Sequence, residues 1–155
     1  MQDLPIYDLL KRDHESVTEL LRRVKAARGD EARDLLAELA REVTAHARAE
    51  EAVFYGHLLH NERTRARILE SLQDHEQIDA RLGELALMQP HDERWSARLD
   101  VLSEDLGQHI DEEENQLFPL ARQILSDREA VEFGRRFAAE RERHIRDQSG
   151  LDAAE

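Results

Sequence analysis

The sequence predicts an all-α protein: an up-down-up-down antiparallel four-helix bundle with a short fifth helix at the C-terminal end. Charged residues make up 37% of the chain and hydrophobic residues 40%, with only 6 Gly and 3 Pro, which is typical of long helices that face water. Apolar residues recur at steps of three and four along four long stretches, and short polar segments separate these stretches. No strand-like alternation of apolar and polar residues stands out.

The length of 155 residues suits one domain with a sizeable core. We expect a single domain over residues 1–155, with the core bundle at about 6–126 and the C-terminal helix at about 127–148. The formal net charge of −13 disfavours nucleic acid and anionic membranes as partners, because phosphate binding needs clustered Lys and Arg. The lack of cysteine excludes disulfides, thiolate catalysis and zinc–thiolate sites. Neither a membrane span nor a secretory pattern is visible, so we expect a cytoplasmic protein.

The first two helices are predicted on either side of Gly29. The first begins just after Pro5, a residue that suits a first helical turn, and the second begins near Asp30, which can cap it. Each apolar seam is interrupted near its middle by polar residues. The two seams are Leu10, His14, Val17, Leu21 and Val24, and then Leu36, Leu39, Val43, His46, Glu50 and Val53.

The third and fourth helices are predicted on either side of Pro90, which marks the end of the third. Pro119 lies inside the pattern of the fourth, where we expect a kink or an end. Their seams are Ile68, Leu72, His75, Asp79, Leu82 and Ala86, and then Leu99, Leu102, Leu106, His109, Glu113, Leu117 and Leu120. Asp127 can cap the fifth helix. The apolar residues of that helix are Val131, Phe133, Phe137 and Ile145.

The chain contains two copies of one helix pair. His46–Gly56 reads H-A-R-A-E-E-A-V-F-Y-G and His109–Pro119 reads H-I-D-E-E-E-N-Q-L-F-P, in step at an offset of 63 residues. A D-H-E triplet precedes each copy, at Asp13–Glu15 and at Asp74–Glu76. One helix of each pair therefore carries a seam histidine, and the other carries H-x-x-x-E. This repetition predicts a duplicated site.

The polar interruptions lie near the middle of each seam, so the bundle should bring them together at similar depth. Six side chains are expected to converge there: His14, His46, Glu50, His75, His109 and Glu113. Imidazole nitrogen with carboxylate oxygen suits iron, manganese or zinc, and six side chains are too many for a tetrahedral zinc site. They fit two metals, each held by two histidines and bridged by Glu50 and Glu113. The alternative is a set of core polar residues joined to one another by hydrogen bonds.

Several other side chains are predicted to lie close to these six. Asp79 lies on the correct face to be a seventh ligand or to hydrogen-bond a neighbouring histidine. Tyr55 can reach the site as a ligand or donor, although packing with a solvated hydroxyl is the commoner role of such a residue. Glu51 and Glu114 lie one step round their helices, where solvent or a ligand histidine is the expected contact. His57, His60 and His91 are expected at the surface, near helix ends and off the seams. His144 lies in the last helix, which can fold over one end of the bundle, so a metal role stays open as the less expected alternative.

Taken together, these motifs resemble the hemerythrin-like, or HHE cation-binding, domains from about Tyr7 to Ile124. The resemblance implies a non-haem di-iron centre with the same six residues as ligands, and it favours two iron ions over manganese or zinc. Oxygen-carrying hemerythrins have a fifth histidine at the position of Asp79, and an H-x-x-x-x-D pattern where this chain has Glu113. More carboxylate donors favour ferric iron, so we expect oxidation or peroxide chemistry rather than reversible oxygen carriage.

The function expected from the resemblance is the binding of dioxygen, peroxide or nitric oxide at a carboxylate-bridged di-iron centre. One alternative is an iron sensor or buffer whose bundle tightens when metal binds. Another is an enzyme that consumes peroxide, so the sequence leaves open whether the protein is a catalyst. No surface for a protein partner can be identified from the sequence.

Overall fold

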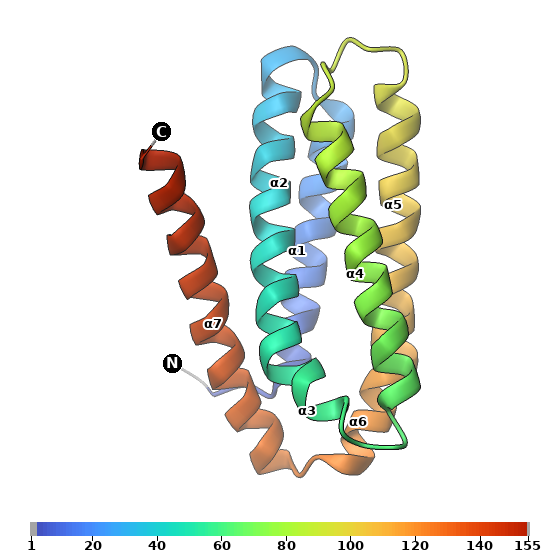
Figure 1. The fold of residues 1–155 in the computed structure, drawn as a ribbon, viewed down its shortest axis with the longest axis vertical. Helices are drawn as coiled ribbons and strands as arrows, with labels where there is room; N and C mark the ends of the chain where they lie inside the picture. The colour runs from blue at the N-terminus through green and yellow to red at the C-terminus, as the bar shows by residue number, and fades with distance from the viewer. Residues whose placement is uncertain (1–2, 155) are drawn as a thin grey trace.

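Four long helices form an antiparallel bundle in the computed structural model, which describes residues 3–154 (Figure 1). They are α1 (Ile6–Ala26), α2 (Gly29–Glu50), α4 (Arg65–Ala86) and α5 (Trp95–Glu112). Contacts between α1 and α2, α2 and α4, α4 and α5, and α1 and α5 close the bundle. Within the described range there is no strand and no helix long and apolar enough to cross a membrane. The predicted fold class is confirmed.

Two π-helical turns continue the second and fourth bundle helices, at matching places in the repeat. The turn η1 (Glu51–Tyr55) leads into α3 (Gly56–Leu58), and η2 (Glu113–Leu117) leads into α6 (Phe118–Ile124). Pro119 therefore does not end the fourth helix, because it lies in the first turn of α6, where a missing N–H is tolerated. The predicted irregularity takes the form of the π turn just before it.

Two of the predicted helix caps are displaced by one or two residues. Gly29 begins α2 with a φ of 58°, a backbone conformation that suits glycine, and Asp30 lies inside the first turn. There its charge still favours the positive end of the helix dipole. The residue that caps the last helix is Ser126 rather than Asp127. Its hydroxyl accepts a hydrogen bond from the backbone N–H of Glu129. In return, the Glu129 side chain accepts a hydrogen bond from the backbone N–H of Ser126.

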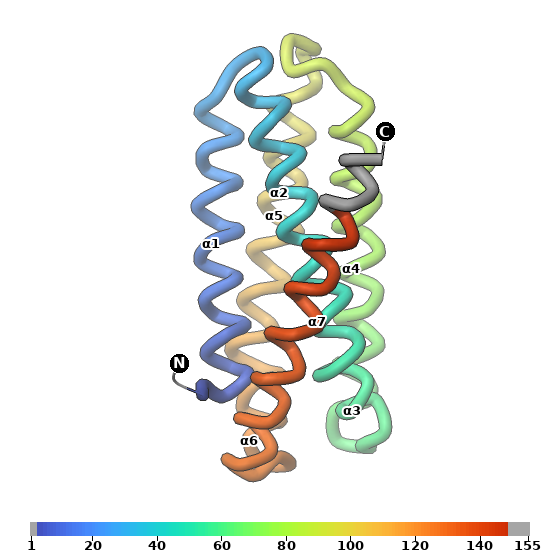
Figure 2. The backbone as a smooth tube through the Cα atoms, turned by 90° about the vertical axis from the view of Figure 1, so that its left-hand side faces the viewer, coloured from blue at the N-terminus to red at the C-terminus, as the bar shows by residue number. Residues whose placement is uncertain are grey.

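The fifth helix, α7 (Asp127–Ala154), lies outside the bundle against α1 and α2 (Figures 1 and 2). Its 28 residues make it longer than the predicted short helix at about 127–148. The last apolar residue of the predicted pattern is Ile145, so apolar spacing alone does not indicate the final turns. Gly134 permits the close approach of α7 to the N-terminal segment, since a Cβ there would collide with the carbonyl oxygen of Leu4.

Two apolar clusters fill the bundle, and a polar layer separates them. The aromatic cluster contains Tyr7, Phe54, Tyr55, Phe118, Phe133 and Phe137 together with neighbouring aliphatic residues. The aliphatic cluster at the other end includes Val17, Leu21, Leu39, Val43, Leu82, Leu99, Leu102 and Leu106. The polar layer consists of His14, His46, Glu50, His75, His109 and Glu113, which are all buried. The predicted interruptions of the four seams therefore do meet at one depth.

Candidate metal centre

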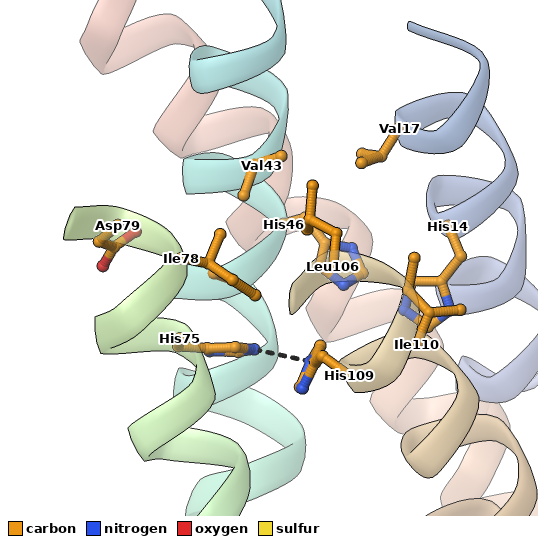
Figure 3. Close-up of a pocket in the computed structure, with 11 residues that line it drawn as sticks. His14, Val17, Val43, His46, His75, Ile78, Asp79, Leu106, His109 and Ile110 are labelled. Atoms are coloured by element: carbon orange, nitrogen blue, oxygen red, sulfur yellow. Dashed lines mark hydrogen bonds between the residues drawn. The ribbon is translucent and has the colours of Figure 1, made fainter. Parts of the chain in front are cut away.

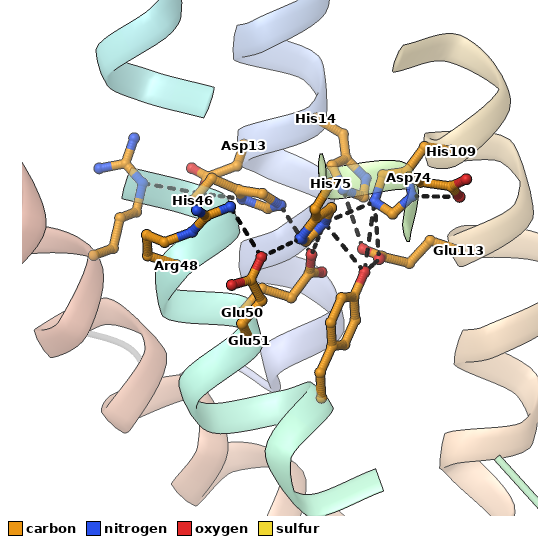
Figure 4. A network of polar contacts seen from close by, with 12 residues as sticks. Asp13, His14, His46, Arg48, Glu50, Glu51, Asp74, His75, His109 and Glu113 are labelled. Atoms are coloured by element: carbon orange, nitrogen blue, oxygen red, sulfur yellow. Dashed lines mark hydrogen bonds and ion pairs between the residues drawn. The ribbon is translucent and has the colours of Figure 1, made fainter. Parts of the chain in front are cut away.

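The polar layer brings ligand-type atoms within reach of one another from all four bundle helices (Figure 4). One group consists of His14, His46, Glu50 and Glu113, and a second of Glu50, His75 and His109. Glu50 Oε1 lies 3.2 Å from His75 Nε2 and 3.7 Å from His46 Nε2. Glu113 reaches His14 Nε2 at 3.3 Å with one oxygen and His109 Nε2 at 3.4 Å with the other. Each glutamate therefore lies between histidines of both copies of the repeat.

Every histidine of the polar layer directs its Nε2 towards the centre. Its second ring nitrogen, Nδ1, donates a hydrogen bond to a carboxylate farther from the centre. Because a carboxylate only accepts, each Nδ1 carries a proton, and each Nε2 faces the centre, where it can bind a metal once any proton it carries has left. The donor–acceptor distances are 2.7 Å for His14–Glu114, 2.8 Å for His46–Asp13, 2.7 Å for His75–Glu51 and 3.3 Å for His109–Asp74. Such pairs orient metal-binding imidazoles and make them better donors.

These outer carboxylates give a structural reason for the repeated motifs. The aspartate of each D-H-E triplet holds the histidine of the next bundle helix in its own copy, as Asp13 does for His46. The second glutamate of each E-E pair holds the histidine of the other copy, as Glu114 does for His14. The expectation that Glu51 and Glu114 contact ligand-type histidines agrees with this geometry. The motifs therefore join the two copies through the polar layer.

Tyr55 belongs to the centre, contrary to the expected packing role with a solvated hydroxyl. Its side chain is fully buried, and its hydroxyl donates to a carboxylate oxygen of Glu113. The hydroxyl also lies 3.5 Å from Nε2 of both His75 and His109. Tyr55 is the last residue of the π turn η1, and the sequence gives no clear sign of that turn. Burial, followed by the charges of Glu113 and Glu50, raises its pKa well above the ordinary value.

Protons compensate the buried charges of the polar layer in the metal-free protein. Burial and then the neighbouring Glu113 raise the pKa of Glu50 well above its ordinary value. Burial acts in the same direction on Glu113, but its close polar contacts with Glu50 and His14 lower the pKa of Glu113 well below its ordinary value. Burial alone would lower the pKa of His14, yet Glu113 and its acidic neighbours raise it to about 9. A cation that binds here must displace such protons.

The orphaned polar atoms of the layer fit a bound metal. Several buried side-chain atoms in the layer have close polar neighbours but no hydrogen bond of regular geometry: both carboxylate oxygens of Glu50, Oε1 of Glu113, and Nε2 of His14 and His46. A buried polar atom left unpaired costs about 1–3 kcal/mol, and native cores keep few of them. Imidazole nitrogen and carboxylate oxygen are donors that suit intermediate transition metals. The side chains present are therefore compatible with a metal site.

A small cavity of about 30 Å³ adjoins the polar layer on the side of the aliphatic cluster (Figure 3). All four histidines of the layer contribute to its lining. The rest of the wall is mostly apolar and consists of Val17, Val43, Ala47, Ile78, Leu106 and Ile110, with Asp79 at one side. The histidine rings therefore have an apolar neighbourhood on this side.

Asp79 does not join the converging donors. Its carboxylate accepts a hydrogen bond from Arg48 at 2.9 Å, and Figure 3 shows it at the outer side of α4. The ion pair offers the charge a partner in a half-exposed position, which is less costly than burial beside Glu50. The other histidines also lie elsewhere. His57, His60 and His91 are exposed, while His144 is half-buried on α7 near Glu140.

The fold and the buried His/Glu cluster define a helical-bundle protein with a site suited to a metal. The family model described as the Hemerythrin HHE cation binding domain matches residues 5–121. The chain therefore belongs to the hemerythrin HHE cation-binding domain family, whose domains bind metal ions. The resemblance inferred from the motifs is confirmed.

A solved structure supports the same fold. It is the crystal structure of a hemerythrin HHE cation-binding domain-containing protein from Mycobacterium kansasii. The similarity has a TM-score of 0.82 and covers 93% of this chain and 89% of that chain, at 24% sequence identity. A comparison with functionally curated proteins gave no match.

Proposed function

We propose that this chain is a non-haem di-iron protein that binds dioxygen or a related small oxidant, peroxide or nitric oxide, at a carboxylate-bridged centre. His14 and His46 would hold one iron and His75 and His109 the other, with Glu50 and Glu113 shared between them. The number of mixed nitrogen and oxygen donors disfavours a tetrahedral zinc site, and membership of the hemerythrin family favours iron over manganese. Bound iron would supply the ability to bind or reduce a small oxidant.

The observation that carries this proposal is the cavity beside the four histidines. Its volume of about 30 Å³ suits a molecule of two or three atoms and excludes larger substrates. Val17, Val43 and Leu106 line it with apolar surface beside the histidines. An apolar pocket with a few convergent polar atoms is the usual form of a small-molecule site.

The chain's own residues position and protonate this site. The four outer carboxylates fix the rings so that the Nε2 atoms point inward. The Tyr55 hydroxyl stays protonated and donates a hydrogen bond to Glu113. A hydroxyl donor this close to the centre also favours the second candidate, an enzyme that disproportionates peroxide into water and dioxygen, because this reaction moves protons between two peroxide molecules. The third candidate, an iron sensor or buffer, requires binding of metal alone.

Optical spectra of the ferrous protein test these possibilities. Purified protein is loaded with ferrous iron without oxygen, and dioxygen, peroxide or nitric oxide is then added. A stable band that disappears when the gas is removed supports binding, whereas evolution of oxygen from peroxide supports the enzyme. Oxidation with no bound species would contradict both and leave the sensor or buffer. Iron, zinc and manganese contents of protein purified without added metal test the choice of metal.

A further inference from the structure

The two copies of the repeat have different surroundings, although their motifs match. We propose that the two metal positions release their metals at different rates: slowly at the His14–His46 position, which α7 covers, and rapidly at the His75–His109 position, which borders an open cleft. This inference rests on the proposed two-metal centre. It assigns to α7, which follows the residues matched by the family model, the role of retaining one metal.

The His46 side of the centre is closed by two residues of α7. Asp13 accepts hydrogen bonds from His46 Nδ1 at 2.8 Å and from Arg141 Nε at 2.9 Å, and Arg141 also pairs with Glu42. The ring of Phe137 lies edge-on to the His46 ring, with centroids 5.6 Å apart, and Phe137 is 1% exposed. The side chain of Asp13 is only 15% exposed. His46 is therefore held both by its outer carboxylate and by the helix that covers it.

The equivalent side of the second copy lacks this cover. Asp74 occupies the repeat position of Asp13, but its contact with His109 Nδ1 is longer, at 3.3 Å, and its side chain is 35% exposed. Among the described residues, the polar contacts of Asp74 include no arginine. A polar cleft of about 180 Å³ reaches His109 here. Its other lining residues are Asp74, Gln77, Asp105 and Gln108.

These differences predict unequal metal release because a metal leaves only when its ligand side chains turn away. His109 can turn towards a cleft that water and a chelator can enter, and Asp74 can follow it with little loss of packing. His46 can turn only if Phe137 and Arg141 move first, which requires α7 to separate locally from α1 and α2. The local opening on the His46 side is therefore rarer, and the metal held there leaves more slowly.

Release kinetics of the ferrous protein test the inference. Full-length protein with two bound irons is mixed, without oxygen, with an excess of a chromogenic ferrous chelator, and absorbance is followed. We expect two phases, each releasing one iron, with the slow phase at least roughly tenfold slower. A single phase from protein that holds two irons would overturn this inference alone. Failure to load two irons would contradict the proposed di-iron centre as well.

Variants on the two sides assign the phases. Arg141→Ala should accelerate the slow phase by roughly tenfold and leave the fast phase unchanged, and Arg141→Lys should restore part of the delay. Asp74→Asn, at a partly exposed position that does not depend on α7, should accelerate only the fast phase. Arg143→Ala is the matched control on α7, because Arg143 pairs with Glu140 away from the centre. Equal acceleration of both phases by Arg141→Ala, or of the slow phase by Asp74→Asn, would overturn the assignment.

Discussion

The aromatic cluster and the polar layer lie next to each other in the protein interior, yet they affect folding in opposite directions. Phe54 and Phe118 are fully buried, and their rings pack against Tyr7, so removing their surface from water stabilises the fold. Glu50 and Glu113 are equally buried, and removing their carboxyl groups from water costs stability unless a partner compensates. The comparison indicates that the polar layer is kept for what it binds rather than for the stability of the metal-free chain.

The largest effect on folding is expected in the aromatic cluster. Phe54→Ala should lower the free energy of unfolding of the metal-free protein by about 3–5 kcal/mol, because it removes a buried ring and leaves a cavity. Denaturant unfolding of the metal-free protein measures this loss. Leu87→Ala is the control, since Leu87 is 89% exposed and its loss should change stability by less than about 0.5 kcal/mol. A small effect of Phe54→Ala would remove the contrast between the two regions.

The next effect is expected on metal content rather than on folding. The Glu113→Ala variant should lose at least one of the two metals. Glu113 lies between His14 and His109, and without its carboxylate a metal there has one ligand fewer. The accompanying loss of stability in the metal-free protein is a separate effect, because the variant leaves His14 and the Tyr55 hydroxyl without their buried partner. Metal analysis of the purified variant is the measurement. Two irons still bound would reject the bridging role.

A smaller effect is expected where the two regions meet, at Tyr55. Tyr55→Phe keeps the buried ring but removes the hydroxyl that donates to Glu113, which should cost about 1–3 kcal/mol in the metal-free protein. We expect the iron content to stay the same, because the six proposed ligands remain. Thermal unfolding and metal analysis of the same sample give both results. If iron were lost from this variant, the phenol oxygen would have to be counted among the ligands.

The smallest effect is expected at Glu114, at the outer edge of the polar layer. Its side chain is 27% exposed and contacts His14 from outside, so Glu114→Ala should cost within about 1 kcal/mol of stability. The protein should still take up two irons when iron is in excess. Metal analysis beside the Glu113→Ala variant provides the comparison. Loss of iron from Glu114→Ala would show that the orientation of His14 depends on this one carboxylate.

Periodicity was sufficient to predict the parts of the fold that depend on local geometry. Because residues three and four apart share a helix face, the seams revealed four long helices and the positions at which polar residues enter them. The matching motifs at His46 and His109 further indicated that the polar residues form a duplicated set. The structure confirms the bundle and places the six residues in one layer. Their role as metal ligands remains a prediction.

Contacts between distant segments decided the rest. The π turn that ends at Tyr55 contributes Phe54 and Tyr55 to the aromatic cluster, and no local pattern distinguishes it from an ordinary helical turn. Asp79 has the spacing of a seam residue, yet Arg48 on the neighbouring helix holds it at the surface.

By itself, the sequence determined the helical class, the repeat and the residues that meet inside the bundle, because these follow from the spacing of side chains along one helix. Only the tertiary structure decided which carboxylate holds which histidine, and that α7 covers His46 while His109 borders a cleft. The physical reason is that a repeated sequence has the same local geometry in both copies. Its surroundings depend on a fifth helix that can pack against only one side.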